Sequence, residues 1–174
     1  MKSRLPLPAP AQLDAAQRAI HDSILATRGS IDGPFLAWLH APGLAEPAQR
    51  LGAFCRYGTA LALVESELLI LTVAGHFHCI GEQQIHEPIA RSAGLADSAV
   101  AALAARQTPT LPDARQRMLW TLASALLQTH RIPQPVYDDA LALFGERTLV
   151  EVVGILGYYA LVAMTLNAFE MRKE

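Results

Sequence analysis

The stretch ESELLILTVAGHFHCIGEQQIHEPIARSAGL, residues 65–95, joins an apolar run to three histidines, one cysteine and four glutamates. Its apolar residues recur at helical spacing, so we expect a long and roughly helical segment. Pro88 cannot donate a backbone hydrogen bond and crowds the carbonyl group of residue 84, which predicts a kink or a restart between residues 81 and 88. Gly94 is well placed to end the segment. The stretch therefore predicts a helix that carries several chemically active side chains.

A helical wheel of this segment gathers its polar side chains on one side. At 100° per residue, an arc of about 120° holds Glu67, His78, Cys79, Glu82 and His86. The opposite side is apolar, as in any helix with a core-facing stripe. A solvated face normally carries lysine or arginine, whereas neither occurs between residues 65 and 91. These residue types favour a functional site, although the periodicity also fits an ordinary surface helix.

Glu82 and His86 stand four residues apart, where side chains on one helix can hydrogen-bond to each other. A carboxyl group in a poorly solvated cleft has a raised pKa, so such a pair can serve as acid and base near neutral pH. The same spacing occurs on many surface helices, and the pair alone is weak evidence. Arg56, just before the long segment, is a candidate for binding an anionic substrate, or else a partner for the end of its own helix.

Metal binding and thiol chemistry are two alternatives for the same stretch. His78, Glu82 and His86 offer nitrogen and oxygen ligands, but they span about 12 Å along a straight helix. Two of them could hold an ion and all three could not, so we predict no metal site. His78 stays a candidate for substrate binding or proton transfer. Cys79 is either a small buried hydrophobic residue or a nucleophile.

The rest of the chain also predicts helices, and no alternating strand pattern occurs. Asp14 is a plausible N-cap and Gly29 a stop for the first helix, and Asp97 or Ser98 is expected to cap a later one. The remaining expected helices cover residues 14–28, 33–43, 44–58, 95–107, 114–131, 135–146 and 147–171. We therefore predict one all-α domain over residues 1–174, a compact bundle of about eight helices behind an extended leader, residues 1–13.

Composition narrows the possible partners. Hydrophobic residues make up 52% of the chain and charged residues 17%, which leaves little polar surface for a monomer and suggests a homo-oligomer. The net charge is −2 and no basic stripe occurs, so we expect no nucleic-acid partner.

Residues 152–169 carry no charge over about the length that spans a bilayer. Glu151 and Glu170 bound them, Asn167 lies inside, and no basic cluster precedes them, so we interpret them as a core or interface helix without membrane contact. The proline-broken N-terminus lacks the apolar run of a signal peptide. Cys55 and Cys79 are then reduced thiols, and the expected location is cytoplasmic.

The segment 65–95 resembles the signature of the carboxymuconolactone decarboxylase family, which includes the alkylhydroperoxidase D group. In that signature a Glu-Leu-x-Ile-Leu start is followed at fixed distance by a glutamate, by a histidine four residues later, and by an alanine-rich helix ending in Ala-Gly-Leu. Glu67, Glu82 and His86 occupy those places. The flanking segments, with the closing GILGYYALVAMTLNAFE, also resemble the longer single-domain members, so the likeness covers nearly the whole chain.

Two departures from the family pattern are informative. The peroxidase branch uses a Cys-x-x-Cys pair, of which Cys79 occupies the first position and Glu82 the second. Without the second thiol a disulfide relay cannot close within the site, and Cys55 is not expected to replace it. The decarboxylase branch has Tyr-Glu-Trp around the glutamate, where this chain has Gly81-Glu82-Gln83. We therefore expect a substrate pocket different from one that binds carboxymuconolactone.

The resemblance implies an all-helical subunit in a dimer, trimer or hexamer, with clefts near the subunit contacts. It implies a cofactor-free acid–base lyase that acts on a small carboxylated or lactone metabolite, as in aromatic-compound catabolism. Glu82 and His86 would handle protons, with Glu67 as a relay partner. Apart from the resemblance, Tyr158 and Tyr159 are candidates either to line the same cleft or to pack at a subunit contact. The alternatives are a thiol redox protein that uses Cys79 with an external thiol, and a non-catalytic oligomer.

Overall fold

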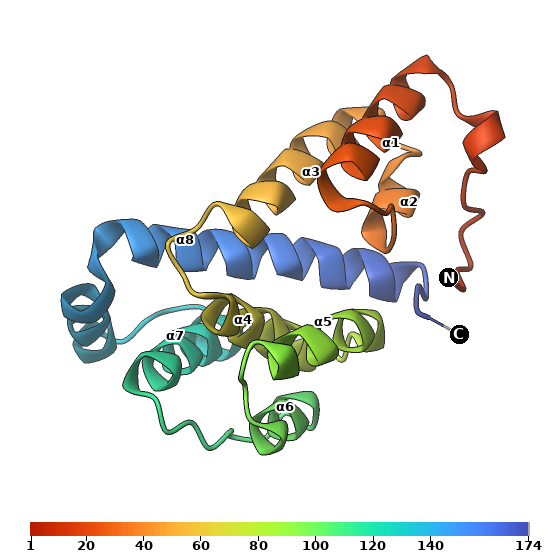
Figure 1. Ribbon diagram of the computed structural model, residues 1–174. Helices are drawn as coiled ribbons and strands as arrows, with labels where there is room; N and C mark the ends of the chain where they lie inside the picture. Colours follow the sequence, from red (N-terminus) through yellow and green to blue (C-terminus); the bar gives the residue numbers. More distant parts are fainter. Residues whose placement is uncertain (174) are drawn as a thin grey trace.

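The structure, a computed structural model, describes residues 1–173, and every regular element in them is a helix (Figure 1). This confirms the all-α prediction. The elements are the 3-10 turn η1 (Pro10–Gln12) and the helices α1 (Ala15–Arg28), α2 (Pro34–Trp38), α3 (Pro42–Tyr57), α4 (Leu63–His76), α5 (Ile80–Ser92), α6 (Asp97–Ala104), α7 (Ala114–Thr129) and α8 (Gln134–Ala168).

Local sequence signals account for several helix ends. The Asp14 side chain accepts a hydrogen bond from the backbone N–H of Gln17, and the Gln17 side chain accepts one from the backbone N–H of Asp14, a capping box at the start of α1. Gly29 ends α1 in the left-handed region with φ of 73°. The expectation for α6 was wrong, because Asp97 is its first helical residue and Ala96 precedes it without a side-chain cap.

The long segment of residues 65–94 is two helices, and its break lies earlier than Pro88 predicts. α4 ends at His76, residues 77–79 form a turn, and α5 begins at Ile80, with Pro88 inside it. His78 takes a left-handed φ of 50°. The turn is held by a hydrogen bond from the Cys79 N–H to the Ala74 carbonyl group, 2.8 Å long. The single helical wheel is therefore wrong, because the chain changes direction between its two halves.

α8 lies in the middle of the molecule and contacts helices from both halves of the chain. In Figure 1, α1, α2 and α3 lie on one side of α8, and α4, α5, α6 and α7 lie on the other. α4 is the most deeply placed helix, since residues 65–75 are all buried against α5, α6, α7 and α8. Gly75 allows this packing, because a side chain there would overlap the Leu103 carbonyl group on α6.

α8 is the one helix in residues 1–173 that is long and apolar enough to cross a membrane. Of its most apolar 18-residue window, 56% is buried inside the molecule, which fits the predicted core helix. A non-helical residue, Gly145 with φ of 75°, bends α8 at the boundary expected between two helices. The bend is visible at the left of Figure 1.

The leader is tied to the other end of the chain. The backbone N–H of Lys2 donates to the Arg172 carbonyl group at 3.0 Å, and that of Arg4 donates to the Phe169 carbonyl group at 2.9 Å. Most of the leader is extended, as expected, but η1 adds a short helical turn. The two ends therefore brace the C-terminal part of α8, beside the helices that carry the candidate site.

Candidate active site

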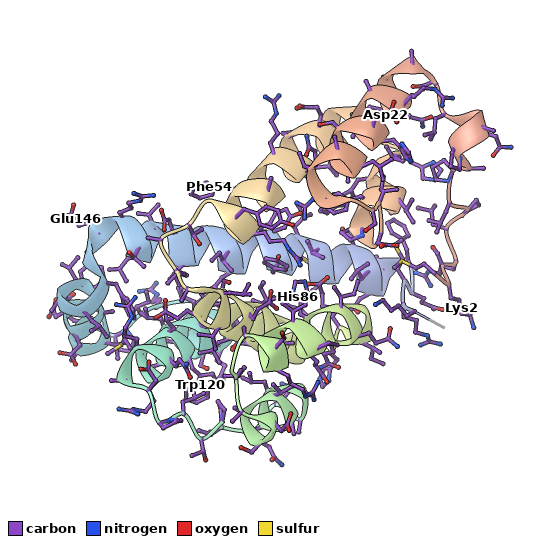
Figure 2. The ribbon with its side chains drawn as sticks, in the orientation of Figure 1. Lys2, Asp22, Phe54, His86, Trp120 and Glu146 are labelled. Carbon is purple, nitrogen blue, oxygen red and sulfur yellow. The ribbon has the colours of Figure 1, made fainter. Side chains whose placement is uncertain are left out.

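Glu67, Glu82 and His86 form one buried cluster where α4 packs against α5. Glu67 Oε2 lies 2.7 Å from His86 Nδ1, and Glu82 Oε2 lies 3.5 Å from His86 Nε2. The three residues are 0%, 4% and 3% exposed, respectively. Figure 2 places His86 between α8 and the α4–α5 pair. The structure thus brings together the three residues that the resemblance assigned to proton handling.

The hydrogen bond to Glu67 orients the imidazole. With Glu67 ionised, His86 Nδ1 carries the proton and donates it to Oε2, which leaves Nε2 facing Glu82. His86 also packs edge-on against Tyr159, with 5.4 Å between ring centroids. The ring is therefore fixed by a carboxylate on one side and an aromatic wall on another, so that Nε2 can exchange a proton with Glu82.

Burial raises the pKa of the Glu82 carboxyl group, and the nearby Glu67 charge reinforces this, while His86 and Arg56 oppose it. Among residues 1–173, Glu82 Oε2 and Glu67 Oε1 have no hydrogen-bond partner. A carboxyl group kept from water and short of donors favours its neutral form. Glu82 is therefore suited to hold a proton and to deliver it.

A cavity of about 170 Å³ opens beside this cluster, between the two sets of helices that flank α8. Its wall includes Glu82, His86, Tyr158 and Tyr159, together with residues of α1, α2 and α3. Burial raises the pKa of both tyrosine hydroxyl groups, so they stay protonated and can donate hydrogen bonds. The cavity thus combines a proton-carrying acid, an imidazole and two hydroxyl donors.

The residues of the wall come from far apart in the sequence. In chain order they are Arg28, Ser30, Asp32, Gly33, Pro34, Phe35, Arg56, Tyr57, Glu82, Ile85, His86, Tyr158, Tyr159 and Val162. Arg56, which the sequence predicted as a candidate for anion binding, is among them. Glu67 does not line the cavity and lies behind His86, in the position of a relay partner.

The structure separates two predicted site residues from this cavity. His78 lies in the turn before α5 and its Nε2 is 2.7 Å from a guanidinium nitrogen of Arg106, outside the cavity wall. Cys79 is 0% exposed and also absent from the wall. The helical wheel put His78 beside Glu82 because it assumed one continuous helix. Cys79 does lie one turn before Glu82, at the start of α5, but it is buried in the core.

Burial raises the pKa of Cys79 to about 11, and that of Cys55 also to about 11. Both thiols are free and buried. A thiol that resists ionisation is a poor nucleophile and a poor metal ligand.

Across the described part of the chain, no three or more histidine, cysteine, aspartate or glutamate side chains are arranged to hold a metal ion. His78 could not join Glu82 and His86 in binding one, because it faces Arg106. The cluster of α4 and α5 is linear instead, with His86 between two carboxyl groups.

Arg28, the last residue of α1, is a residue of the wall that sequence reasoning missed. Its guanidinium carbon lies 4.6 Å from the centre of the Phe35 ring. An arginine that ends a helix before a glycine is normally a partner of the helix dipole. No local pattern distinguishes Arg28 from that ordinary role, since Phe35 and the cavity come from other elements.

The sequence matches no protein-family model, and no curated protein matches it. Several solved structures do resemble the chain, and two of them are the following. One is an uncharacterized peroxidase-related protein from Ralstonia eutropha JMP134, described as an alkylhydroperoxidase AhpD core, with a TM-score of 0.81 and 18% identity. The fold is that of the AhpD core. The other is an uncharacterized peroxidase-related protein from Silicibacter sp. TM1040, with a TM-score of 0.79 and 16% identity.

Each likeness covers 99% of this chain and 92% of the other chain, so nearly the whole chain shares the architecture. The predicted alkylhydroperoxidase D-like fold is confirmed. At 16–18% identity the likeness concerns the fold alone, and the chemistry must be argued from the site.

Proposed function

We propose that the protein is a cofactor-free acid–base enzyme of the carboxymuconolactone decarboxylase type, acting on a small carboxylated or lactone metabolite. One observation supports this above the others: Glu82, a buried acid with a raised pKa, faces a cavity and lies 3.5 Å from an imidazole that Glu67 orients. A carboxyl group whose burial favours the protonated form, placed beside an oriented imidazole, suits acid–base work.

The proposed reaction replaces a carboxylate by a proton. The bond between the substrate carbon and its carboxylate breaks, carbon dioxide leaves, and the electron pair moves into a conjugated carbonyl group to give an enolate. Glu82 then donates its proton to the carbon, and His86 passes a solvent proton back to Glu82. The net reaction consumes one proton and releases one carbon dioxide.

Other groups of the cavity act on the charge that develops. The hydroxyl groups of Tyr158 and Tyr159 can donate to the enolate oxygen, and Arg56 adds a positive charge nearby. Such donors act strongly where water is excluded, because they need no reorganisation when the charge appears. Glu67 stabilises the imidazolium form of His86 during the proton relay.

The test is carbon dioxide release from a panel of β-keto acids and unsaturated lactone acids. We expect the wild type to decarboxylate at least one of them, and E82Q and H86A to lose turnover by about 100-fold or more, as general acid–base groups do. E87Q is the matched control, because Glu87 lies next to His86 on α5 but binds the exposed Arg91. Full activity in folded E82Q would refute the assignment.

A thiol peroxidase is the second candidate, and the names of the two structural neighbours favour it. In that reaction Cys79 would be oxidised by hydrogen peroxide to sulfenic acid with release of water. Two molecules of an external thiol would then reduce it to the thiol, with release of a second water and of their disulfide. The burial of Cys79 and its raised pKa oppose this chemistry. Peroxide consumption that requires an added thiol and disappears in C79S would establish the second candidate instead.

A further inference from the structure

Arg28 has one edge of its guanidinium group without any partner. Among residues 1–173, its Nε and Nη2 atoms are buried and make no hydrogen bond. These two nitrogens form the edge that binds a carboxylate by two parallel hydrogen bonds. The residue lies on the wall of the cavity that contains Glu82 and His86. Arg28 thus belongs to the wall of the candidate active site, and its unused edge lies buried beside the cavity.

Elsewhere the protein pairs its buried charges. Buried Glu65 binds Arg115, with 2.7 Å between Oε1 and Nε, and buried Glu151 binds Arg147 at 2.8 Å. In the described chain neither Arg28 nor Arg56 forms an ion pair. A buried donor without an acceptor destabilises the folded chain, and more so when it is charged. An anionic ligand would remove that destabilisation.

The charged residues around the cavity do not supply Arg28 with an anionic partner. Asp32 is exposed at the cavity wall and makes no hydrogen bond or ion pair within residues 1–173, while burial and the Glu67 charge favour the neutral form of Glu82. Arg56 adds a second positive charge to the wall. The surplus positive charge lies on the α1–α3 side, opposite the proton-handling cluster.

The shape of the cavity restricts the rest of the ligand. Aromatic rings of Phe35, Tyr57, Tyr158 and Tyr159 contribute to the wall, and Arg28 stacks on the first of them. Sites for drug-sized ligands measure roughly 300–1,000 Å³. A cavity of about 170 Å³ therefore suits a smaller, flat molecule with about one ring.

We propose that Arg28, together with Arg56, binds the carboxylate of a small, flat, single-ring or conjugated acid in this cavity. The inference rests on the proposed function, of which it names the substrate class. Neither buried nitrogen of Arg28 contacts solvent, so binding requires a small side-chain movement that turns this edge toward the ligand, as is common at binding sites. Arg28 is then a specificity residue that selects acids over neutral molecules.

The test is calorimetric titration with benzoate, and with benzamide as a neutral molecule of the same shape. We expect the wild type to bind benzoate at least 10-fold more tightly than benzamide, and R28Q to lose at least 10-fold in benzoate affinity. The benzoate affinity of R28K should lie between those of the wild type and R28Q, because lysine keeps the charge but lacks the planar pair of donors. R50Q is the matched control, since Arg50 on α3 is an exposed partner of Glu46.

Several outcomes would overturn the inference. They are equal affinity for benzoate and benzamide in the wild type, no benzoate binding, or R28Q with wild-type affinity. If R28Q does not fold, the benzoate affinities of R28K and R56Q test the inference in its place. Wild-type affinity in both variants would overturn the inference.

E82Q separates this inference from the proposed reaction. We expect it to bind benzoate with about wild-type affinity, because Glu82 is not the anion-binding group. Benzoate binding that depends on Arg28, in a protein that decarboxylates nothing, would contradict the reaction alone. Decarboxylation that depends on Glu82 but not on Arg28 would contradict the carboxylate site alone.

Discussion

Glu82 is a residue whose ionisation works against folding. Its pKa is raised by burial in the folded chain, whereas the unfolded chain returns it to about 4.3. Between those two values the folded state binds a proton that the unfolded state does not. The contribution of Glu82 to stability is therefore fully present below about pH 4 and is lost as the pH rises through the folded pKa.

This linkage predicts that E82Q unfolds at a higher temperature than the wild type at neutral pH, with a difference that grows from pH 4.5 to pH 8. Each unit of raised pKa corresponds to about 1.4 kcal/mol, or about 3–5 °C in a chain of this size. Thermal unfolding followed by circular dichroism measures it, with E87Q as control. A difference between E82Q and wild type that does not change with pH would contradict the raised pKa.

Gly52 on α3 is a second residue on which the cavity depends. A Cβ atom there would overlap the Tyr158 hydroxyl group and lie 3.1 Å from Arg28 Nη2. We expect G52A to cost about 1–3 kcal/mol in urea unfolding, as overpacking does, and to weaken benzoate binding. G43A, also on α3, has open space around its Cβ position and should be close to neutral. Equal stability of the two variants would contradict the tight contact at Gly52.

At the scale of elements, the sequence predicts helix ends that local chemistry determines. Asp14 and Gly29 mark the ends of α1 as expected, and α8 bends at Gly145, close to the boundary expected between residues 146 and 147. The turn between α4 and α5 was missed because a histidine, His78, takes the left-handed conformation that normally marks a glycine. Its neighbourhood is set by tertiary contacts, such as the Asn167 side chain donating to the Phe77 carbonyl group at 2.7 Å.

The residues of the candidate site also differ in whether local sequence or tertiary packing determines their place. Glu82 and His86 were predictable because they lie one turn apart on one helix. The contact of Glu67 with His86 joins α4 to α5, and the role of Glu67 was inferred from the family resemblance. Arg28 was not predictable, since only the packing of α1–α3 against α8 places it at the cavity.

Glu151 ties α8 to the loop between α3 and α4 and should make the fold sensitive to acid. Its carboxylate accepts hydrogen bonds from the Ala60 N–H, at 2.7 Å, and from Arg147 Nε, at 2.8 Å. Burial alone would raise the pKa of Glu151, but these two donors lower it overall. Stability from this depressed pKa is present above the unfolded value, about 4.3, and is lost as the pH falls through the folded value.

We therefore expect E151Q to cost about 1.5–3 kcal/mol at pH 7, the range for hydrogen bonds to charged groups, and less below pH 4. R147Q should cost at most about 1 kcal/mol, because Arg147 is exposed. Urea unfolding at both pH values measures these differences. A larger cost in R147Q than in E151Q would show that the Ala60 contact is unimportant.

At the scale of the whole molecule, an apolar face of α8 remains uncovered. Val150, Val153 and Met164 are 72%, 53% and 51% exposed, and they recur at helical spacing. An apolar groove between α7 and α8 adjoins Val150 and Val153. Exposed apolar faces of this kind mark interaction sites. We propose that a second copy of the chain covers this face of α8.

The oligomer proposal predicts more than one subunit in light scattering of the wild type, and dissociation in the double variant V150D/V153D. L25D is the control, because Leu25 on α1 is also exposed but lies on another element. A monomeric wild type at micromolar concentration would contradict the proposal.

The most direct test of the central claim is the infrared titration of Glu82 in the whole protein. The wild type minus E82Q difference spectrum should show the C=O stretch of a protonated carboxylic acid, and its titration midpoint should lie well above about 4.3, the ordinary value for glutamate. A midpoint at or below that value would mean that Glu82 carries no proton to deliver.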